Sequence, residues 1–305
     1  LQLDGNKANQ SGSVGMAGID FNNMGGGSGA SARHGAKITN VRANKWYASV
    51  GSNCQGGIGI CLRASSNSTL VGNTAQGNGR KGIYLSSSSN NTLTGNTAQG
   101  NVFDGIYLSS SSNNNLTGNT AQSNGGGGSS SGICLDSSSN NTLTGNTAQS
   151  NSNYGIILSS SSNNTITSNS VYGNSDGIYL YGSSSNTVND NAVQANVQHG
   201  MYLYSCSNNV LNGNTVQGNG DFAGMGGIYL YNSSSNTVSA NSIHDNGGGL
   251  TNDGIYLDGA SSNTITGNTI TDTGCSISCY AINIFEWTSD KNYLESNRFS
   301  GSAAN

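Results

Sequence analysis

The sequence predicts an all-β fold: a single-stranded right-handed parallel β-helix of roughly 10 to 12 coils with three short parallel sheets. One observation is a repeated glycine before an Ile-x-Leu or similar core, at positions 59, 82, 105, 132, 155, 177, 200, 227 and 254, with Ala281 in the next place. The intervals between these positions are 22, 23 or 27 residues. A second observation is that apolar residues keep fixed offsets inside each repeat, in runs too short for helices. A regular period built from short strands is typical of a solenoid.

Residues 82–104 illustrate how one coil is built. In Gly82-Ile83-Tyr84-Leu85 the apolar residues alternate, so Ile83 and Leu85 are expected to point inward and Tyr84 outward. Residues 92–94 and 97–99 predict the second and third strands, each with one inward apolar residue. Between them lies a Gly-Asn bend whose asparagine is expected inward, where it can hydrogen-bond its counterparts above and below. That asparagine recurs at Asn73, Asn96, Asn119, Asn146, Asn169, Asn191, Asn214, Asn241 and Asn268.

We expect one β-helix domain over residues 1–305. Residues 1–58 are expected to form irregular first coils with a long loop, residues 59–285 the regular coils, and residues 286–305 the C-terminal end. The segments 18–21 and 37–41 read as strands, and residues 1–6 already read as a strand and a turn. Because stacked coils leave an open edge at each end, we expect a cap or flanking domains beyond this sequence.

The composition excludes two classes of partner. Net charge is −4, only 8% of residues are charged, and no basic stripe is present that would neutralise nucleic-acid phosphates. No long apolar run predicts a membrane-spanning segment. The close pairs Cys54/Cys61 and Cys275/Cys279 favour disulfides and an oxidising compartment, and several Asn-x-Ser/Thr sequons point the same way. We therefore expect an extracellular or cell-surface protein.

The coil repeats resemble the pectate-lyase-like parallel β-helix superfamily, specifically archaeal surface β-helix proteins such as disaggregatases. The opening Leu-Asp-Gly-Asn-Lys of residues 3–7 also resembles mannuronan C5-epimerases. Those epimerases carry Tyr-Gly-Phe-Asp-Pro-His on a first strand, of which Tyr154–Ile156 keeps only the start. Residues Ile157–Ser159 replace the Asp-Pro-His part, and the motif is equally absent at Ile58–Arg63, so epimerase activity is not expected.

The resemblance implies that chemistry takes place on the outer face of the first strand. Stacked tyrosines there offer flat apolar faces with hydroxyls at the rim, which suit sugar rings. The alternative is that tyrosine only stabilises cross-strand stacking on a β-surface. The expected substrate-binding residues on and beside this face are Arg63, Tyr84, Tyr107, Tyr179, Tyr181, Tyr202, Tyr204, Tyr229, Tyr231, Tyr256 and Asp253.

The column just before the repeated glycine contains the candidate acid–base groups. Three successive coils place Tyr154, Asp176 and His199 in a line, and a carboxylate between a phenol and an imidazole is a workable acid–base set. The alternative is that Asp-Gly and His-Gly are ordinary turn dipeptides, which Asp104 and Asp253 in the same column favour. A hydrolase would instead need two carboxylates roughly 5 to 9.5 Å apart. Candidates for such a pair are Asp104, Asp136 and Asp176, or Asp253 with Asp258 or Glu286.

These features predict an extracellular carbohydrate-active enzyme. It would cleave an acidic or amino-sugar polysaccharide by hydrolysis or β-elimination on the outer face of the first sheet. The alternative is a non-catalytic surface solenoid, such as an adhesin or a sheath component. No cofactor is predicted, because the histidines are scattered and no metal-ligand spacing appears. Calcium held by surface aspartates is an alternative that no spacing supports.

Overall fold

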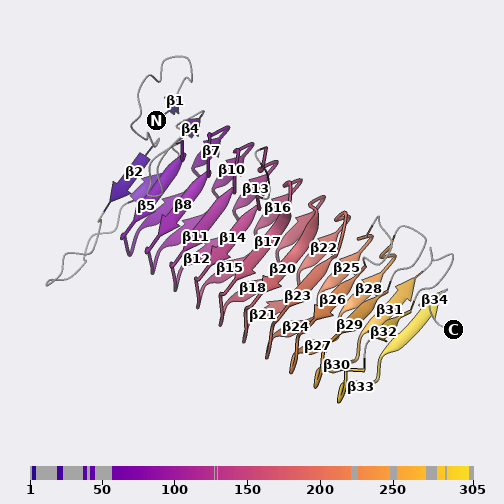
Figure 1. Ribbon diagram of the computed structural model, residues 1–305. Coiled ribbons are helices and arrows are strands. Elements are labelled where there is room, and N and C mark those ends of the chain that lie inside the picture. The colour runs from indigo at the N-terminus through magenta and orange to yellow at the C-terminus, as the bar shows by residue number, and fades with distance from the viewer. Residues whose placement is uncertain are drawn as a thin grey trace, which may run out of the picture. The chain divides into compact units, whose positions relative to one another are not determined.

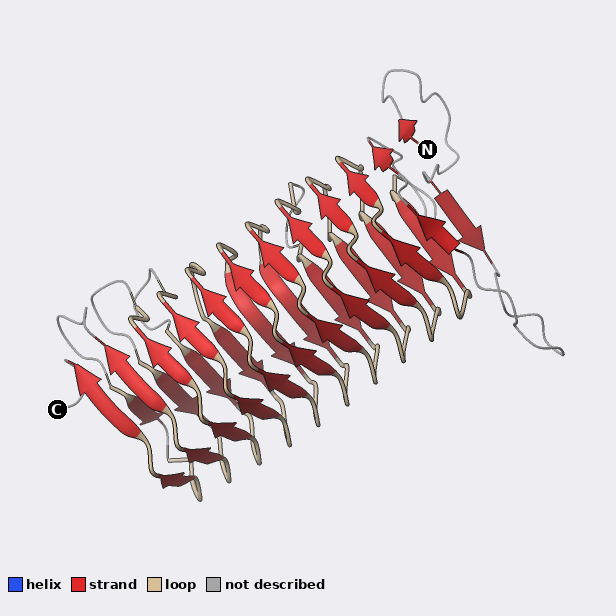
Figure 2. Ribbon diagram, turned by 180° about the vertical axis from the view of Figure 1, so that it is seen from behind, coloured by secondary structure: helices blue, strands red, loops and turns tan. Residues whose placement is uncertain are grey.

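The computed structural model describes the backbones of residues 2–4, 19–22, 37–39 and 42–44, and residues 57–126, 128, 130–220, 226–247, 253–272, 280–285 and 287–301. The chain divides into two compact units, Leu1–Asn153 and Tyr154–Asn305, each of which is taken by itself below. The described residues of both units form strands and turns, without any helix (Figure 2). Accordingly, the described part offers no helix with the length and apolar character needed to cross a membrane.

The first unit contains three parallel sheets, named here by the order in which the chain visits them in one coil. Its first sheet consists of β2 (Ile19–Asn22), β5 (Ile60–Arg63), β8 (Ile83–Ser86), β11 (Ile106–Ser109) and β14 (Ile133–Asp136). Its second sheet consists of β3 (Lys37–Thr39), β6 (Thr69–Val71), β9 (Thr92–Thr94), β12 (Asn115–Thr117) and β15 (Thr142–Thr144). Its third sheet consists of β1 (Gln2–Asp4), β4 (Arg42–Asn44), β7 (Thr74–Gln76), β10 (Thr97–Gln99), β13 (Thr120–Gln122) and β16 (Thr147–Gln149).

The second unit repeats this arrangement. Its first sheet consists of β17 (Tyr154–Ser159), β20 (Asp176–Tyr181), β23 (Met201–Tyr204), β26 (Ile228–Tyr231), β29 (Ile255–Asp258) and β32 (Ile282–Phe285). Its second sheet consists of β18 (Thr165–Thr167), β21 (Thr187–Asn189), β24 (Val210–Asn212), β27 (Thr237–Ser239), β30 (Thr264–Thr266) and β33 (Tyr293–Glu295). Its third sheet consists of β19 (Ser170–Tyr172), β22 (Ala192–Gln194), β25 (Thr215–Gln217), β28 (Ser242–His244), β31 (Thr269–Asp272) and β34 (Arg298–Gly301).

Within each unit like residues lie directly over like residues. Strand β8 pairs with β11 in parallel, so that Tyr84 faces Tyr107. In the second unit β23 pairs with β26, which sets Tyr202 against Tyr229. In Figure 1 the strands of each sheet accordingly run as parallel arrows, one coil beside the next. The predicted fold class and the predicted strands are confirmed, and rows of the sequence become stripes on the surface.

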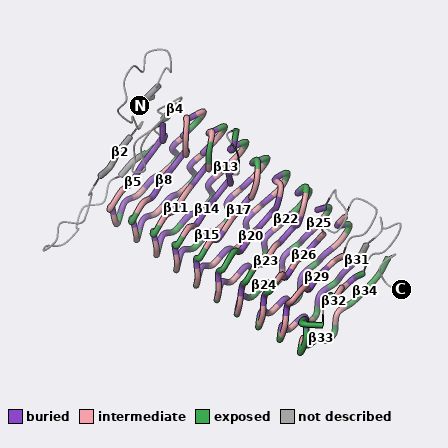
Figure 3. Tube along the Cα trace, in the orientation of Figure 1, coloured by how far each residue is buried: buried purple, intermediate pink, exposed green. Residues whose placement is uncertain are grey.

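The core lies inside the coils, where the apolar residue of each strand points. Ile83, Leu85, Leu93 and Ala98 are fully buried, as the alternation predicted, and Figure 3 shows the same alternation along the coils of each unit. The repeated glycine is required by space rather than by backbone angles. A Cβ added at Gly82 would lie 2.6 Å from the Asn101 side-chain nitrogen and 2.7 Å from the Gly105 carbonyl oxygen, closer than real Cβ contacts.

Buried asparagines hold the bends together, and each is fully hydrogen-bonded. The side chain of Asn96 donates to Asn119 Oδ1 at 2.9 Å and to the Leu70 carbonyl at 2.9 Å. Its own Oδ1 accepts the Asn73 backbone N–H at 3.0 Å and the Asn73 side-chain amide at 2.8 Å. This ladder confirms the prediction for the Gly-Asn bends. Two further asparagine ladders and a serine ladder fill the other corners, running through Asn91, Asn101 and Ser88 in this coil.

The described cysteines differ in whether they form a disulfide bond. Cys61 is disulfide-bonded, which fits the predicted pairing, although Cys54 lies outside the described residues. Both members of the predicted pair Cys275/Cys279 also lie outside them. Cys134 and Cys206 are free and buried.

Candidate functional site

A stripe of stacked tyrosines follows the outer face of the first sheet in the second unit. Tyr179, Tyr202, Tyr229 and Tyr256 come from β20, β23, β26 and β29, and successive ring centroids are each 4.9 Å apart. Their planes are inclined by only 24°, 4° and 16° from one ring to the next. In-register parallel pairing repeats the same side chain in every coil, and this repetition produces the stack. The result is a long, nearly continuous aromatic strip.

A second tyrosine row lies two residues further along the same strands. The rings of Tyr181 and Tyr204 are 5.3 Å apart, and those of Tyr204 and Tyr231 are 5.0 Å apart. Tyr181 is 46% exposed, the most accessible tyrosine of the two rows. The two rows approach within 6.0 to 6.2 Å of each other, at Tyr229 and Tyr231 and at Tyr202 and Tyr204. Together these rows form an aromatic surface two side chains wide, called the tyrosine face below.

A His–Asp pair lies at the entrance edge of the tyrosine face. His199 Nδ1 is 2.8 Å from Asp176 Oδ1, and the two side chains are only 9% and 7% exposed. The His199 ring packs beside Tyr202 and Tyr229, with centroids 4.9 and 5.2 Å away. Because a carboxylate only accepts, Nδ1 must carry the proton, and Nε2 of the neutral imidazole is then an acceptor. The structure thus joins two members of the predicted acid–base set.

The third member, Tyr154, takes a different contact. Its Cα is paired with that of Asp176 between β17 and β20, as the column predicted. Its ring lies against Tyr179, with centroids 4.7 Å apart, so Tyr154 extends the aromatic stack.

Aspartates in this column also have a structural role. Asp176 Oδ1 accepts the backbone N–H of His199 at 3.0 Å. Asp104 accepts that of Ser131, and Asp253 that of Tyr280, both at 2.9 Å. An aspartate before the glycine therefore caps the strand of the next coil. This capping is the turn role weighed as the alternative, and in Asp176 one oxygen serves both the backbone and the imidazole.

A small recess opens beside His199, with room for about one water molecule. It is lined by His199, Gly226, Ile228, Tyr229, Asp253 and Tyr256. Along the column His199, Gly226 and Asp253 belong to three successive coils, and Gly226 packs directly against the Asp253 backbone, where a Cβ would lie 2.3 Å from the Asp253 carbonyl oxygen. Asp253 Oδ2 accepts a hydrogen bond from the Asn283 amide at 2.8 Å.

Burial sets the ionisation of these groups. It raises the pKa of Asp253, and the hydrogen bonds from Asn283 and the Tyr280 backbone offset this only in part. Burial likewise raises the pKa of Tyr179, Tyr202 and Tyr229, and the Asp258 carboxylate raises that of Tyr229 further. These three phenols therefore stay protonated near neutral pH. Their hydroxyl groups can donate and accept hydrogen bonds there but do not act as bases.

The first unit has its own cluster on the corresponding face. Lys81 Nζ lies 3.8 Å from the ring centroid of Tyr107 and 4.9 Å from that of Tyr84, a cation–π arrangement. Tyr107 donates its hydroxyl hydrogen to Asp136 Oδ2 at 2.9 Å. Burial lowers the pKa of Lys81 and raises that of Asp104, while the two charges partly compensate each other. The sequence analysis did not assign Lys81, although its place before Gly82 was a signal.

Several outward positions of the first unit are covered. Tyr84 is only 8% exposed and packs with Ile58 and Cys61, while Cys134 in the same column is 7% exposed. Ile58, Cys61 and Tyr107 pack around Tyr84 and Lys81 lies over its ring, so alternation alone misjudged the accessibility of this part of the face. Tyr84 consequently offers little surface to a ligand, and the face is open mainly at Tyr107. Arg63 lies at the half-buried end of β5.

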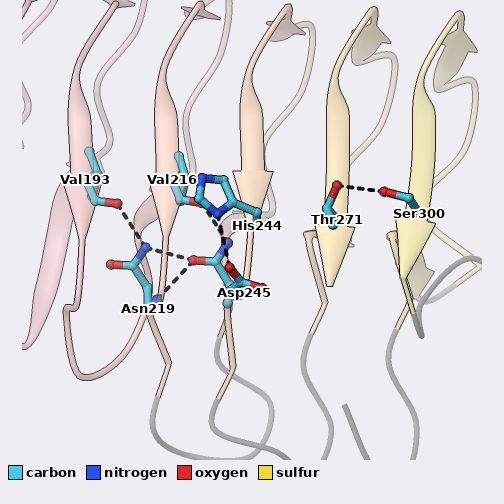
Figure 4. Close-up of polar contacts among 8 residues, drawn as sticks. Val193, Val216, Asn219, His244, Asp245, Thr271 and Ser300 are labelled. Atoms are coloured by element: carbon cyan, nitrogen blue, oxygen red, sulfur yellow. Dashed lines mark hydrogen bonds and ion pairs between the residues drawn. The ribbon is translucent and has the colours of Figure 1, made fainter. Parts of the chain in front are cut away.

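Other predicted features lie elsewhere. His244 belongs to the third sheet, where its Nδ1 is 3.3 Å from Asp245 Oδ2 (Figure 4). The same view shows the asparagine ladder of the second unit, in which Asn219 donates to the Val193 carbonyl. Glu286, one of the candidate carboxylates, lies outside the described residues. The hydrogen bond from Asn283 to Asp253 was not predicted.

Comparison with known families identifies the class of fold. Residues 128–226 match the model of the right handed beta helix region. Residues 3–131 and 198–305, together more than half of the chain, match the model described as periplasmic copper-binding protein (NosD). The chain belongs to this NosD family of right-handed parallel β-helix proteins. No curated protein matches it in sequence.

The family description mentions copper. Copper sites gather imidazole, thiolate or thioether ligands around one point. Within the described ranges no group of three or more His, Cys, Asp or Glu side chains is placed to hold a metal. The Nδ1 atoms of His199 and His244 each face an aspartate of their own. The described residues therefore do not fit a copper centre.

Solved structures of similar fold include enzymes that act on carbohydrates. The mannuronan C-5 epimerase AlgE4 A-module of Azotobacter vinelandii has a TM-score of 0.57 and 16% identity, covering 88% of this chain and 87% of its own. DFA-IIIase from Arthrobacter chlorophenolicus A6 has a TM-score of 0.60 and 15% identity, covering 86% and 65%. The Dettilon tailspike protein (gp208) has a TM-score of 0.53 and 14% identity, covering 86% and 62%. The chain spans less than two thirds of the last two, and identities this low show the fold alone.

Proposed function

We propose that this protein binds a polysaccharide along the tyrosine face of its second unit and cleaves it beside His199, in an extracytoplasmic compartment. The observation that carries the proposal is the His199–Asp176 pair, which lies against the stacked tyrosines and lines the recess. Flat aromatic faces with protonated hydroxyls at their rims suit sugar rings. An imidazole oriented by a carboxylate suits proton transfer at the bond that breaks.

Cleavage requires proton transfers that these residues are able to make. The neutral imidazole of His199 has an acceptor at Nε2, and Asp176 stabilises the imidazolium that forms when this atom takes a proton. Asp253 also lines the recess, and because burial raises its pKa it would act as a proton donor for hydrolysis at mildly acidic pH. In β-elimination His199 would instead remove the proton next to the uronate carboxyl group.

Support for the compartment comes from two sources. Cys61 is disulfide-bonded, which is typical of oxidising compartments. The family is described as periplasmic.

The test is an activity screen with matched variants. The protein is incubated with uronate, amino-sugar and neutral polysaccharides, and the products are followed by reducing-end formation and by ultraviolet absorbance of unsaturated sugars. On the active substrate, His199→Ala is expected to lower turnover by about 100-fold or more. His244→Ala is the control, because that imidazole lies on the third sheet. Equal turnover of the wild type and His199→Ala would overturn the catalytic assignment.

A non-catalytic surface solenoid is the second candidate. Asp104 and Asp253 cap the next coil in the same way as Asp176 does. Because this capping is a structural role, it explains the presence of Asp176 without catalysis and favours the second candidate. In that case the tyrosine face would still bind sugar chains but leave them intact. Binding without new reducing ends or unsaturated products, across the whole panel, would select this candidate.

A further inference from the structure

The two units differ sharply in charge, and the difference bears on the substrate. Residues 154–305 contain only two basic residues, Lys291 and Arg298. Their acidic residues are Asp176, Asp190, Asp221, Asp245, Asp253, Asp258, Asp272, Glu286, Asp290 and Glu295. Lys291 follows β32 and has Asp290 3.8 Å away, and Arg298 belongs to the third sheet. The described first-sheet face of this unit therefore has carboxylates and no Lys or Arg.

The carboxylates lie at the tyrosine face itself. Asp253 lines the recess, and Asp258, at the end of β29, accepts the Tyr229 hydroxyl hydrogen at 3.2 Å. Asp176 holds the His199 ring at the edge of the same recess. A polymer of uronates would have to lie along this face with its own negative charges unpaired, which is unfavourable.

The recess also offers hydrogen-bond acceptors. The side chain of His199 is only 9% exposed, and no described residue bonds its Nε2, which is an acceptor when the imidazole is neutral because Asp176 accepts the Nδ1 proton. The Asp253 carboxylate, whose oxygens accept from the Tyr280 N–H and the Asn283 amide, adds negative charge at the same recess. Tyr229 and Tyr256 complete the lining with ring faces that attract cations. Acceptors, carboxylates and aromatic faces around one small opening are complementary to an ammonium group.

We infer that the recess between His199 and Asp253 binds the protonated amino group of an amino sugar, so that the second unit selects a polysaccharide with free amines. This inference rests on the proposed function and narrows its substrate class. The sugar ring lies on Tyr229 and Tyr256, its ammonium group enters the small recess that His199 and Asp253 line, and the chain continues along the tyrosine stripe. An N-acetyl group is neutral and bulkier, and a uronate carboxylate has the wrong charge.

The test compares three oligosaccharides of equal length: glucosamine, N-acetylglucosamine and galacturonate oligomers. Binding to the full chain is measured by calorimetry at about pH 7, where an ordinary imidazole is mostly neutral, carboxylates are ionised and the amine is still largely charged. The glucosamine oligomer is expected to bind at least tenfold more tightly than the other two, and added salt should weaken its binding. Equal or tighter binding of the acetylated or uronate oligomer would overturn the inference and leave the proposed function standing.

Variants localise the effect. Asp253→Asn keeps an acceptor for the Tyr280 N–H, so the coil stays capped, and glucosamine binding is expected to fall roughly tenfold. Asp245→Asn is the matched control, because this exposed aspartate lies after β28 of the third sheet. Unchanged binding by Asp253→Asn would overturn the placement in the recess. If none of the three oligomers binds and the activity screen yields no product, the proposed function fails as well.

Discussion

The Asp176 oxygen Oδ1 lies 2.8 Å from His199 Nδ1 and 3.0 Å from the backbone nitrogen of the same residue. One atom therefore both caps the next coil and orients the imidazole. The capping role is shared with Asp104 and Asp253, and only Asp176 adds the imidazole contact. The two roles differ in what they require: capping needs an acceptor, whereas stabilising an imidazolium needs a negative charge.

Asp176→Asn separates these roles. The amide oxygen still accepts the backbone N–H, so the midpoint of thermal unfolding should change little. Without the charge the imidazolium is no longer stabilised, and turnover of the active polysaccharide should fall about 100- to 10,000-fold. Turnover and unfolding are measured on the same preparation. If Asp176→Asn lowered the thermal unfolding midpoint but left turnover unchanged, Asp176 would have a structural role only.

The asparagine ladder predicts a large cost for a small deletion. Asn96→Ala removes the partner of the Asn73 N–H and side-chain amide and of the Leu70 carbonyl, all of which stay buried. Unfulfilled buried polar groups cost about 1–3 kcal/mol each, so the free energy of unfolding should fall by about 3 kcal/mol or more. Urea unfolding measures this loss. Asn115→Ala, on the exposed end of β12, should change it by less than about 0.5 kcal/mol.

Cys206 occupies a position that serine takes in the neighbouring coil. Its Sγ donates to the Leu180 carbonyl at 3.3 Å and accepts the Ser183 N–H at 3.4 Å, whereas Ser233 makes the equivalent donation to the Leu203 carbonyl at 3.1 Å. Cys206→Ser should therefore leave the unfolding free energy within about 1 kcal/mol, and Cys206→Ala should lower it more than serine does. Urea unfolding of the two variants under the same conditions measures this difference. If Cys206→Ala were at least as stable as Cys206→Ser, the role assigned to the Sγ hydrogen bonds would be wrong.

The free thiol itself should be inert in the folded protein. Burial raises the pKa of Cys206 to about 11, and only 2% of the residue is exposed. Because the thiolate is the reactive form, a disulfide reagent at about pH 8 should label it only after denaturation. Rapid labelling of the native protein at Cys206, located by mass spectrometry, would be inconsistent with this environment.

The raised pKa of Asp104 predicts that the stability difference between the wild type and Asp104→Asn depends on pH. Its folded pKa is raised, chiefly by burial, so the folded state binds its proton more tightly than the unfolded state does. The ionised form is therefore destabilising above the folded pKa, and this cost disappears as pH falls below the unfolded value. Asp104→Asn keeps an acceptor for the Ser131 N–H and should unfold at higher urea than the wild type at about pH 7, with no advantage at about pH 3. An advantage that persists at low pH would refute the electrostatic cause.

The coil repeat was sufficient to predict the fold. Its period fixed which residues share a column, and the inward positions of Ile83, Leu85, Leu93 and Ala98 followed from alternation. Side-chain accessibility was harder to predict, because it depends on how neighbouring side chains pack over one another. Tyr84 and Cys134 are outward by alternation but buried, and Tyr84 is covered by Ile58, Cys61 and Tyr107.

The site was predicted in part for the same reason. Column position correctly brought Asp176 next to His199 and stacked Tyr179 on Tyr202. What it did not reveal is the direction of a flexible side chain, such as that of Lys81 over Tyr107. Nor did it reveal the small recess that His199, Tyr229 and Asp253 line. Such features depend on side-chain rotamers and on packing, and the column positions read from the sequence give neither.

The ladders make every coil interchangeable with its neighbour, and this has an evolutionary consequence. Deleting residues 83–105 would join Gly82 to Ile106 and restore Gly-Ile-Tyr-Leu, with every asparagine again one coil from an asparagine. Duplicating the same segment would add one coil under the same rule. Slippage between near-identical DNA repeats therefore offers a way to remove or add coils without a new folding problem, and the number of stacked tyrosines would change with it.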